Sequence, residues 1–264
     1  MTSVLFLGTG GARFVVARQV RASGGMWMRF GQTQIHVDPG PGALVRALSQ
    51  VPPCNPRELD GIALSHKHLD HSGDVNALIE AMTAGGFRPR GTLLAPRDAL
   101  VGEYVVLPYA QKFPERVQIV EEASGPYRIG DVEIRTSVRH VHSVETYGLH
   151  FTHEGSTLSY LPCGRYFDGL AEDYARHEPD TLIVNVLRYA DSMDVDHLVW
   201  ADACRIVETV KPKVAVFQHF GTKMLEEDPV RLAQAFEDAS GIRAIAAHDG
   251  YLLDVATEVS AFAG

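Results

Sequence analysis

The chain has 264 residues, 45% of them apolar and 22% charged, with 24 glycines and 14 prolines. These values are typical of globular proteins and argue against disordered or fibrous chains, and the length allows one or two domains. The net charge of −9 argues against a broad nucleic-acid or anionic-membrane surface. Three cysteines (Cys54, Cys163 and Cys204) are too few for a disulfide framework and indicate a reducing compartment, so we expect a cytoplasmic protein.

The chain opens on an apolar strand, Val4–Leu7, followed by the glycine-rich stretch Gly8–Gly11. A dinucleotide-binding fingerprint would need its third glycine at Arg13, so we interpret the stretch as a tight backbone turn. The N-terminus lacks the basic start of a signal peptide, and no apolar run reaches the ~20 residues of a membrane helix. We therefore expect no membrane partner.

Apolar periodicity predicts strands along both halves of the chain. After the first, strands are expected at Met26–Phe30, Gln32–Val37, Ile62–Leu64, Thr92–Ala95, Val117–Val120, Val132–Ser137, Gly148–His153, Thr157–Leu161, Asp180–Val186, Val214–Gln218, Arg243–Ala246 and Tyr251–Val255. Helices are expected at Ala43–Leu48, Asp74–Ala84, His197–Val210 and Asp228–Ala239. Strand-rich halves with outer helices and no linker between them predict one continuous α/β sandwich over residues 1–264.

The segment Leu64-Ser65-His66-Lys67-His68-Leu69-Asp70-His71 carries the strongest chemical signal. Four potential metal ligands, His66, His68, Asp70 and His71, fall within six residues directly after an expected strand. In an extended chain His66, His68 and Asp70 would share one side, and a turn into the next helix would bring His71 alongside. Imidazole and carboxylate groups bind zinc and comparable metals, so a metal site is favoured over a solvated loop.

This motif resembles that of the metallo-β-lactamase superfamily, whose fold is a four-layer αββα sandwich. The resemblance extends over roughly residues 3–255, through Asp38 in IHVDPG, His142 in HSVETYG and His219 in VAVFQHFG. It implies a metal-dependent hydrolase that binds one or two metal ions per chain, zinc first, with manganese or iron as alternatives.

The resemblance also implies the roles of the site residues. His66, His68 and His142 would hold one metal, and Asp70, His71 and His219 a second, so that a metal-bound hydroxide attacks the substrate. Asp38 would orient a ligand histidine by a hydrogen bond rather than bind metal. Asp74 is expected to be the N-cap or a first-turn acid of its own helix.

One position departs from the family pattern. Where the superfamily places an aspartate that bridges two metals, this chain has Cys163, in LSYLPCGR. A thiolate can bind zinc, and a metal would deprotonate it, but buried cysteines are more often structural. Both interpretations stay open, with the metal ligand favoured.

The opening LFLGTGGA and the histidine contexts look most like ribonuclease Z and the cyclic phosphodiesterases. However, only 21 residues separate His142 from Cys163, which leaves no room for an arm that grips transfer RNA. The glutamate expected beside a catalytic histidine is Asn185, although His197 stands where that histidine would be. We therefore expect Asp70 and His197 to be catalytic, and a small-molecule substrate rather than a nucleic acid.

Substrate binding has two candidate residue types. Arg13, Arg18 and Arg21 cluster in one loop, and guanidinium groups suit an anionic phosphate or carboxylate. Hydrolysis of a phosphodiester or another small ester-like substrate is therefore the leading hypothesis. A lactone or thioester would instead favour a tyrosine near the leaving group, and the candidates are Tyr147, Tyr166 and Tyr189.

Two other classes of function stay open. A single-iron, oxygen-using member of the superfamily would need fewer ligands at the second site. A non-catalytic metal-binding protein would have lost the bridging ligand, although all six His and Asp positions are present. The sequence leaves the oligomeric state open, and a homodimer is compatible with it.

Overall fold

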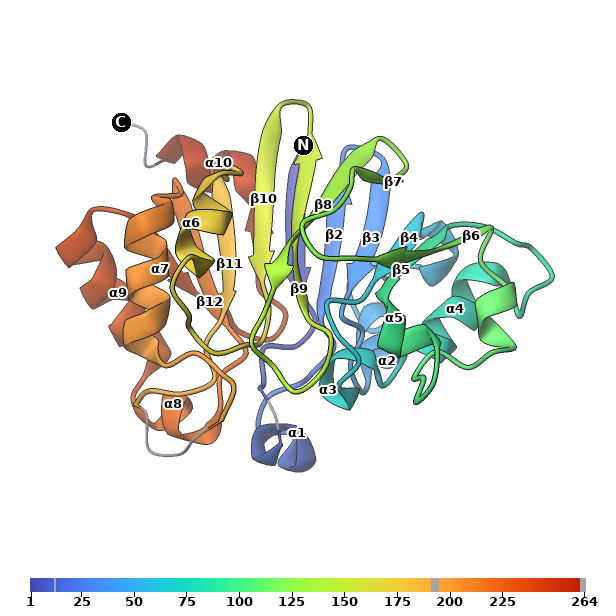
Figure 1. The fold of residues 1–264 in the computed structure, drawn as a ribbon, viewed down its shortest axis with the longest axis horizontal. Helices are drawn as coiled ribbons and strands as arrows, with labels where there is room; N and C mark the ends of the chain where they lie inside the picture. Colours follow the sequence, from blue (N-terminus) through green and yellow to red (C-terminus); the bar gives the residue numbers. More distant parts are fainter. Residues whose placement is uncertain (12, 191–194, 262–264) are drawn as a thin grey trace.

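The computed structural model describes residues 1–11, 13–190 and 195–261. Two seven-stranded sheets pack face to face, and helices cover the outer face of each (Figure 1). The resulting order of layers is helix, sheet, sheet, helix, which confirms the αββα sandwich expected from the sequence. Within the described ranges, no helix has both the length and the apolar character needed to cross a bilayer.

The first sheet joins the N-terminal strands to a strand near the C-terminus. In spatial order it contains β14 (Leu252–Asp254), β1 (Thr2–Phe6), β2 (Met26–Phe30), β3 (Thr33–Val37), β4 (Gly61–Ala63), β5 (Thr92–Pro96) and β6 (Arg116–Val120). The strands from β3 to β6 run parallel, so their carboxyl ends lie at one edge.

The second sheet also combines a parallel half with an antiparallel half. In spatial order it contains β13 (Arg243–Ala246), β12 (Val214–Gln218), β11 (Thr181–Asn185), β10 (Ser156–Leu161), β9 (Tyr147–His153), β8 (Val132–Arg139) and β7 (Tyr127–Ile129). Its parallel strands, β10 to β13, therefore also share an edge at their carboxyl ends.

The helices divide between the two outer faces, with α1 projecting alone beside the carboxyl-end edge (Figure 1). The first sheet is covered by α2 (Ala43–Leu48), α4 (Val75–Thr83) and α5 (Arg97–Leu100), while α3 (Leu69–Ser72) lies at the carboxyl-end edge. The second is covered by α6 (Leu170–Ala175), α7 (Trp200–Val210) and α9 (Pro229–Ser240). The remaining helices are α1 (Phe14–Arg18), α8 (Thr222–Glu226) and α10 (Val255–Ala261), with short 3-10 turns at Pro56–Glu58 and Ala110–Lys112.

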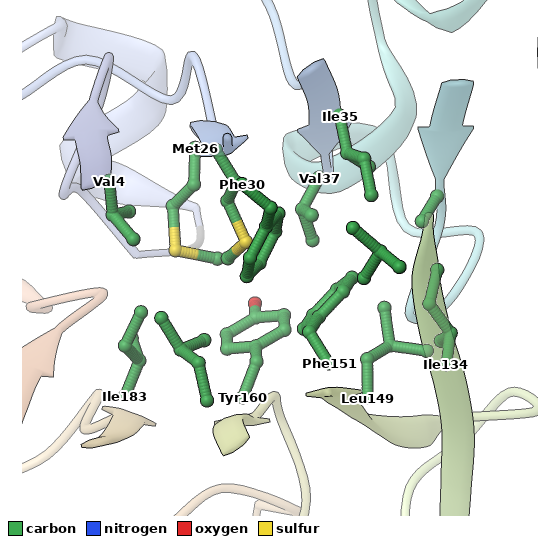
Figure 2. Packing of buried hydrophobic residues seen from close by; sticks show 14 of the residues in the cluster. Val4, Met26, Phe30, Ile35, Val37, Ile134, Leu149, Phe151, Tyr160 and Ile183 are labelled. Carbon is green, nitrogen blue, oxygen red and sulfur yellow. The ribbon is translucent and has the colours of Figure 1, made fainter. Parts of the chain in front are cut away.

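The main core fills the space between the sheets. Figure 2 shows Val4, Phe30 and Val37 of the first sheet facing Phe151 and Tyr160 of the second. The rings of Phe30 and Phe151 stack with their centroids 5.7 Å apart. Because successive side chains of a strand point to opposite faces, the alternate residues of the same strands pack beneath the outer helices.

Every strand and helix expected from the sequence is present, with bounds shifted by at most three residues. The largest shift is at α7, which begins at Trp200 rather than His197. Seven of the described helices and strands were not expected: α1, α3, α5, α6, β7, α8 and α10. The first of these has no side-chain cap at Arg13, and a single buried residue, Val15, anchors it.

The glycines after β1 serve close backbone approach. A Cβ atom on Gly8 would lie 2.2 Å from the Gly24 nitrogen, and one on Gly11 would lie 2.4 Å from the His219 carbonyl oxygen. The backbone of this loop pairs with Phe220 through hydrogen bonds of 2.9 and 3.0 Å. The stretch interpreted as a tight turn thus joins the two sheets at the edge that carries the histidines.

A buried histidine lies beneath α6, away from that edge. His150 donates or accepts a 2.7 Å hydrogen bond at Nδ1 with Ser159 Oγ, and its ring stacks on His177 at a centroid distance of 3.6 Å. Its Nε2 atom has no partner among the described residues. Burial, reinforced by His177 and His140, holds the pKa of His150 well below its ordinary value.

This shift predicts a pH-dependent contribution to stability. Because the folded-state pKa lies below the unfolded value of ~6.5, the contribution is fully present above that pH and is lost as the pH falls. Between about pH 8 and pH 5 the wild type should lose about 2 kcal/mol more than His150→Gln, measured by urea unfolding of metal-free protein. His248→Gln, at an exposed position, is the matched control. Equal pH dependence in wild type and His150→Gln would contradict the assignment.

Candidate metal centre

The candidate ligands lie at the carboxyl-end edge of both sheets. Asp38 directly follows β3, and His66 begins the loop after β4 that leads into α3. On the second sheet, Cys163 follows β10 and His219 directly follows β12. Parallel strands end at a common edge, so segments far apart in the sequence bring their side chains together there.

Three overlapping groups of side chains could each hold an ion. In each group, one potential ligand atom per residue lies within 4.8 Å of the others. The groups are His66, His68 and His142; then Asp70, His71 and His219; and, between them, His66, His71 and Cys163. The third group takes one histidine from each of the others, so Cys163 lies where a ligand shared by two ions would lie.

The unpaired and facing nitrogen atoms of the centre fit bound cations. His66 Nε2 is buried and has no partner among the described residues. His142 Nε2 lies 3.0 Å from His68 Nδ1, and His71 Nε2 lies 2.9 Å from His219 Nε2. Ring nitrogens that converge in this way need either protons or a metal between them.

The first group is held in the protonation state that binds metal. Burial and the neighbouring His66 lower the pKa of His68 to about 4. Burial lowers the pKa of His142 to about 3, although Cys163 acts in the opposite direction. Both imidazoles are therefore neutral near neutral pH, with lone pairs free for a cation.

Hydrogen bonds to the outer ring nitrogens fix how the imidazoles are turned. His142 Nδ1 donates to the carbonyl oxygen of Asp196 at 2.9 Å. His68 Nε2 lies 3.3 Å from Ser143 Oγ. Such partners select the tautomer that directs the other nitrogen at the ion.

Asp38 is the most heavily bonded group beside the centre. Its carboxylate accepts hydrogen bonds from the Ser65 backbone and hydroxyl at 2.7 and 2.6 Å, from Tyr160 at 2.9 Å and from His71 Nδ1 at 3.0 Å. Ser65 Oγ also lies 3.0 Å from His66 Nδ1. Asp38 thus orients His71 directly and His66 through Ser65, and it belongs to none of the three groups of candidate ligands.

The second group is charged when no cation is present. Burial alone would raise the pKa of Asp70, but His71 and His219 hold it well below the ordinary range. Burial would lower the pKa of His219, but Cys163 and Asp70 raise it to about 9. A cation that binds here therefore displaces protons from the imidazoles.

Cys163 contacts both halves of the centre. Its Sγ atom lies 3.5 Å from His71 Nε2 and 3.7 Å from His219 Nε2, and the residue is 3% exposed. Burial raises the pKa of the thiol, but His219 and His71 outweigh that effect and hold it well below its ordinary value. The two imidazoles therefore favour the thiolate, which is the form of cysteine that binds metal.

An open cavity of about 600 Å³ lies over the centre. His68, His142, Cys163 and His197 line it on the side of the candidate ligands, and Arg13 lines it from the loop before α1. His197 Nδ1 is buried without a partner among the described residues. The cavity is therefore the access route to the centre, with His197 beside it.

The other two arginines of the N-terminal loop stand apart from that cavity. Arg18 is exposed on α1. Arg21 donates hydrogen bonds to Thr9 Oγ1 at 2.9 Å and to the Ala247 carbonyl at 2.8 Å, and it lies over the Phe220 ring. Its guanidinium therefore ties the C-terminal loop to the N-terminal loop.

The tyrosine candidates lie outside the described residues that line the cavity. Tyr147 is buried in the core between the sheets, Tyr166 packs against Arg205, and Tyr189 is partly exposed. Asp74 stands at the N-cap position of α4, as expected, but its side chain makes no capping hydrogen bond there. Its carboxylate instead accepts a 3.0 Å hydrogen bond from the Leu44 backbone, in the first turn of α2.

Sequence reasoning missed two residues that hold the centre together. Ser65 links Asp38 to His66, and Tyr160 links Asp38 to Asn185. Ser65 had a weak signal, because it stands directly before the first histidine. Tyr160 had none, since a tyrosine in an apolar strand looks like core.

Comparison with known proteins gives a consistent picture. The family model for the beta-lactamase superfamily domain matches residues 33–220. The uncharacterized protein MJ1374 of Methanocaldococcus jannaschii is 29% identical over 261 residues, covering 96% of this chain and 94% of that protein. The probable metallo-hydrolase YhfI of Bacillus subtilis is 27% identical over 192 residues, covering 71% of this chain and 75% of its own.

Solved structures share the fold at lower identity. The crystal structure of YhfI superposes with a TM-score of 0.73 at 20% identity, covering 96% of this chain and 98% of that chain. A diphosphatase of the PhnP family gives 0.67 at 22% identity, and the short form of human tRNase Z gives 0.70 at 18%. They cover 96% of this chain and, respectively, 97% and 99% of their own.

The geometry predicts that His66 matters for the whole centre. Because it belongs to two of the three groups, His66→Ala should lower the bound metal from about two ions per chain to one or none. The measurement is elemental analysis of protein purified without added chelator. His248→Ala, at an exposed position, should keep the wild-type content. Metal-free wild-type protein whose melting temperature is unchanged by a chelator would contradict the assignment.

The contacts of Cys163 generate a separate prediction. Protein loaded with cobalt(II) should show a near-ultraviolet thiolate-to-metal charge-transfer band. Cys163→Ala should remove the band and lower metal content, whereas Cys163→Asp should remove the band and retain the metal. Cys204→Ala, on the outer helix α7, is the matched control. A band that survives in Cys163→Ala would show that the sulfur is not a ligand.

Proposed function

The chain belongs to the beta-lactamase superfamily and is a metal-dependent hydrolase, and on that premise we propose that it cleaves a small phosphodiester or ester-like substrate. The observation that carries the proposal is the meeting of three ligand groups at one side of an open cavity of about 600 Å³. A cavity of that size suits a small molecule.

Zinc is the proposed metal, at two ions per chain. The donor set combines five imidazoles, one carboxylate and one thiolate, namely His66, His68, His71, His142, His219, Asp70 and Cys163. Zinc accepts all three ligand types, whereas magnesium and calcium prefer oxygen alone. When bound, such ions supply Lewis acidity and a water of lowered pKa.

The protein's own residues would bind and protonate the substrate. Arg13 has no partner among the described residues and lines the cavity, so it is available to an anionic group. Asp196 also lines the cavity, but Arg165 pairs with it at 3.2 Å. Arg13 therefore gives its side of the cavity, whose lining also includes the acidic Asp70, a positive charge that suits an anionic group.

His197 is the proposed general acid. Its ring lies beside His142 and His219, with centroid distances of 5.1 and 6.3 Å, so it borders both halves of the centre. In hydrolysis, a water oxygen bonds to the phosphorus or carbonyl carbon while the bond to the leaving oxygen breaks. His197 would deliver the proton that the leaving oxygen needs, and Asp70 would hold its side of the centre in place as a ligand.

The proposed substrate range excludes transfer RNA. Between His142 and Cys163 the chain forms only the antiparallel pair β9 and β10. The net charge of −9 also works against a polyanion. The proposed location is the cytoplasm, in keeping with Cys54, Cys163 and Cys204 all being free thiols.

A substrate panel tests this function. Zinc-loaded protein should hydrolyse at least one member of a panel of nitrophenyl phosphodiesters, lactones and thioesters, and should leave precursor transfer RNA intact. His197→Gln should lower kcat by about 10²-fold or more with metal content unchanged, because a positioned general acid contributes about that much. His177→Gln, two residues after the end of α6 and outside the lining of the cavity, is the matched control. Specific cleavage of precursor transfer RNA at a rate similar to that of the small substrates would contradict the proposal.

A further inference from the structure

The cavity over the metal centre has an apolar wall. Its lining includes Val16 and Ala17 of α1, Leu69 of α3, and Val195. These residues come from three separate segments of the chain, and they face the same space as His68 and Cys163. The apolar wall is therefore formed jointly by these segments and not by a single helix.

Leu69 is the most informative member of this wall. It stands between the candidate ligands His68 and Asp70, yet its side chain is 69% exposed. Single exposed leucines are ordinary on protein surfaces. Here the exposed apolar side chain lies beside the reacting groups, and residues of α1 and Val195 line the same cavity, so the apolar surface is continuous with the site.

The same cavity also has a positively charged side chain in its lining. Arg13 lines the cavity immediately before α1, and its guanidinium has no partner among the described residues. An apolar wall and an available cation at one site together fit a ligand that has both an apolar part and a negative charge.

We infer that the substrate is an amphipathic anion: a phosphodiester or ester whose negative group lies between the metal centre and Arg13, and whose aryl or alkyl group packs against Val16, Ala17 and Leu69. This inference rests on the proposed hydrolytic function and specifies its substrate class. Burial of a phenyl group against such a wall favours binding by about tenfold or more, because apolar area leaves water.

Binding of two phosphonates tests the inference without turnover. Methylphosphonate and phenylphosphonate carry the same charged group and differ in apolar area. Titration calorimetry on zinc-loaded protein should give a Kd for phenylphosphonate about tenfold below that for methylphosphonate. The ratio should fall to within about threefold of unity in Val16→Ser and Leu69→Ser, whereas Arg13→Gln should weaken both ligands by a similar factor.

The controls separate the wall from the metal centre. Val45→Ser removes an apolar side chain that is 67% exposed on α2, outside the lining of the cavity, and should leave the ratio unchanged. Leu69→Ser is adjacent to ligands, so its metal content is measured, and Val16→Ser provides the same test from α1. Equal affinity for the two phosphonates, binding of neither, or a ratio that survives both substitutions would overturn the inference.

The result is distinguishable from the outcome for the proposed function. A tenfold ratio that depends on Val16 and Leu69, in a protein that hydrolyses no member of the panel, would support the amphipathic site and reject the assigned reaction. Hydrolysis without any preference for the apolar ligand would do the reverse.

Discussion

The rest of the centre depends on the hydrogen bonds that the Asp38 carboxylate accepts. This carboxylate is buried at the end of β3, and a buried carboxylate is stable only when donors surround it. Its donors come from the loop after β4, from α3 and, through Tyr160, from the opposite sheet. The same set of hydrogen bonds therefore fixes the distance between the sheets and the direction of the imidazoles. The backbone around Asp38 is also closely packed. A Cβ atom on Gly25 would lie only 2.1 Å from the Asp38 carbonyl oxygen.

The sequence predicted those parts of the molecule that repeat a local pattern. Strands with alternating or continuous apolar residues, and the dense run from His66 to His71, have signals within a few residues of one another. The helix α1 lacks such a signal, because it has only five residues, a single buried apolar side chain (Val15) and no capping side chain at Arg13. The hydrogen-bond partners of Arg21 and Asp74 could not be predicted from the sequence either, because each partner belongs to a distant segment of the chain. Local pattern identifies the candidate ligands, while contacts with distant segments decide which charged neighbours are structural.

Cys163 and Asn185 are best understood together. Asn185 Nδ2 donates to Tyr160 Oη at 3.0 Å and lies 3.7 Å from the Cys163 sulfur, while its carbonyl oxygen accepts from Gln218 at 3.1 Å. A carboxylate at this position would place another negative charge beside the thiolate and near Asp38. The neutral amide instead directs a donor at the sulfur. The two departures from the family pattern are therefore chemically compatible, since an amide at 185 suits an anionic sulfur at 163.

The separation of the ligands along the chain has a consequence for the lifetime of the protein. His71 and His219 are 148 residues apart in sequence, and the segments that carry them follow strands of different sheets. An ion held by both closes a long loop, much as a covalent cross-link would, and restricts the unfolded chain more than the folded one. Metal supply would then govern how often the sandwich opens. A cell short of metal would hold a population of this protein that is more accessible to proteases, so abundance would follow metal availability.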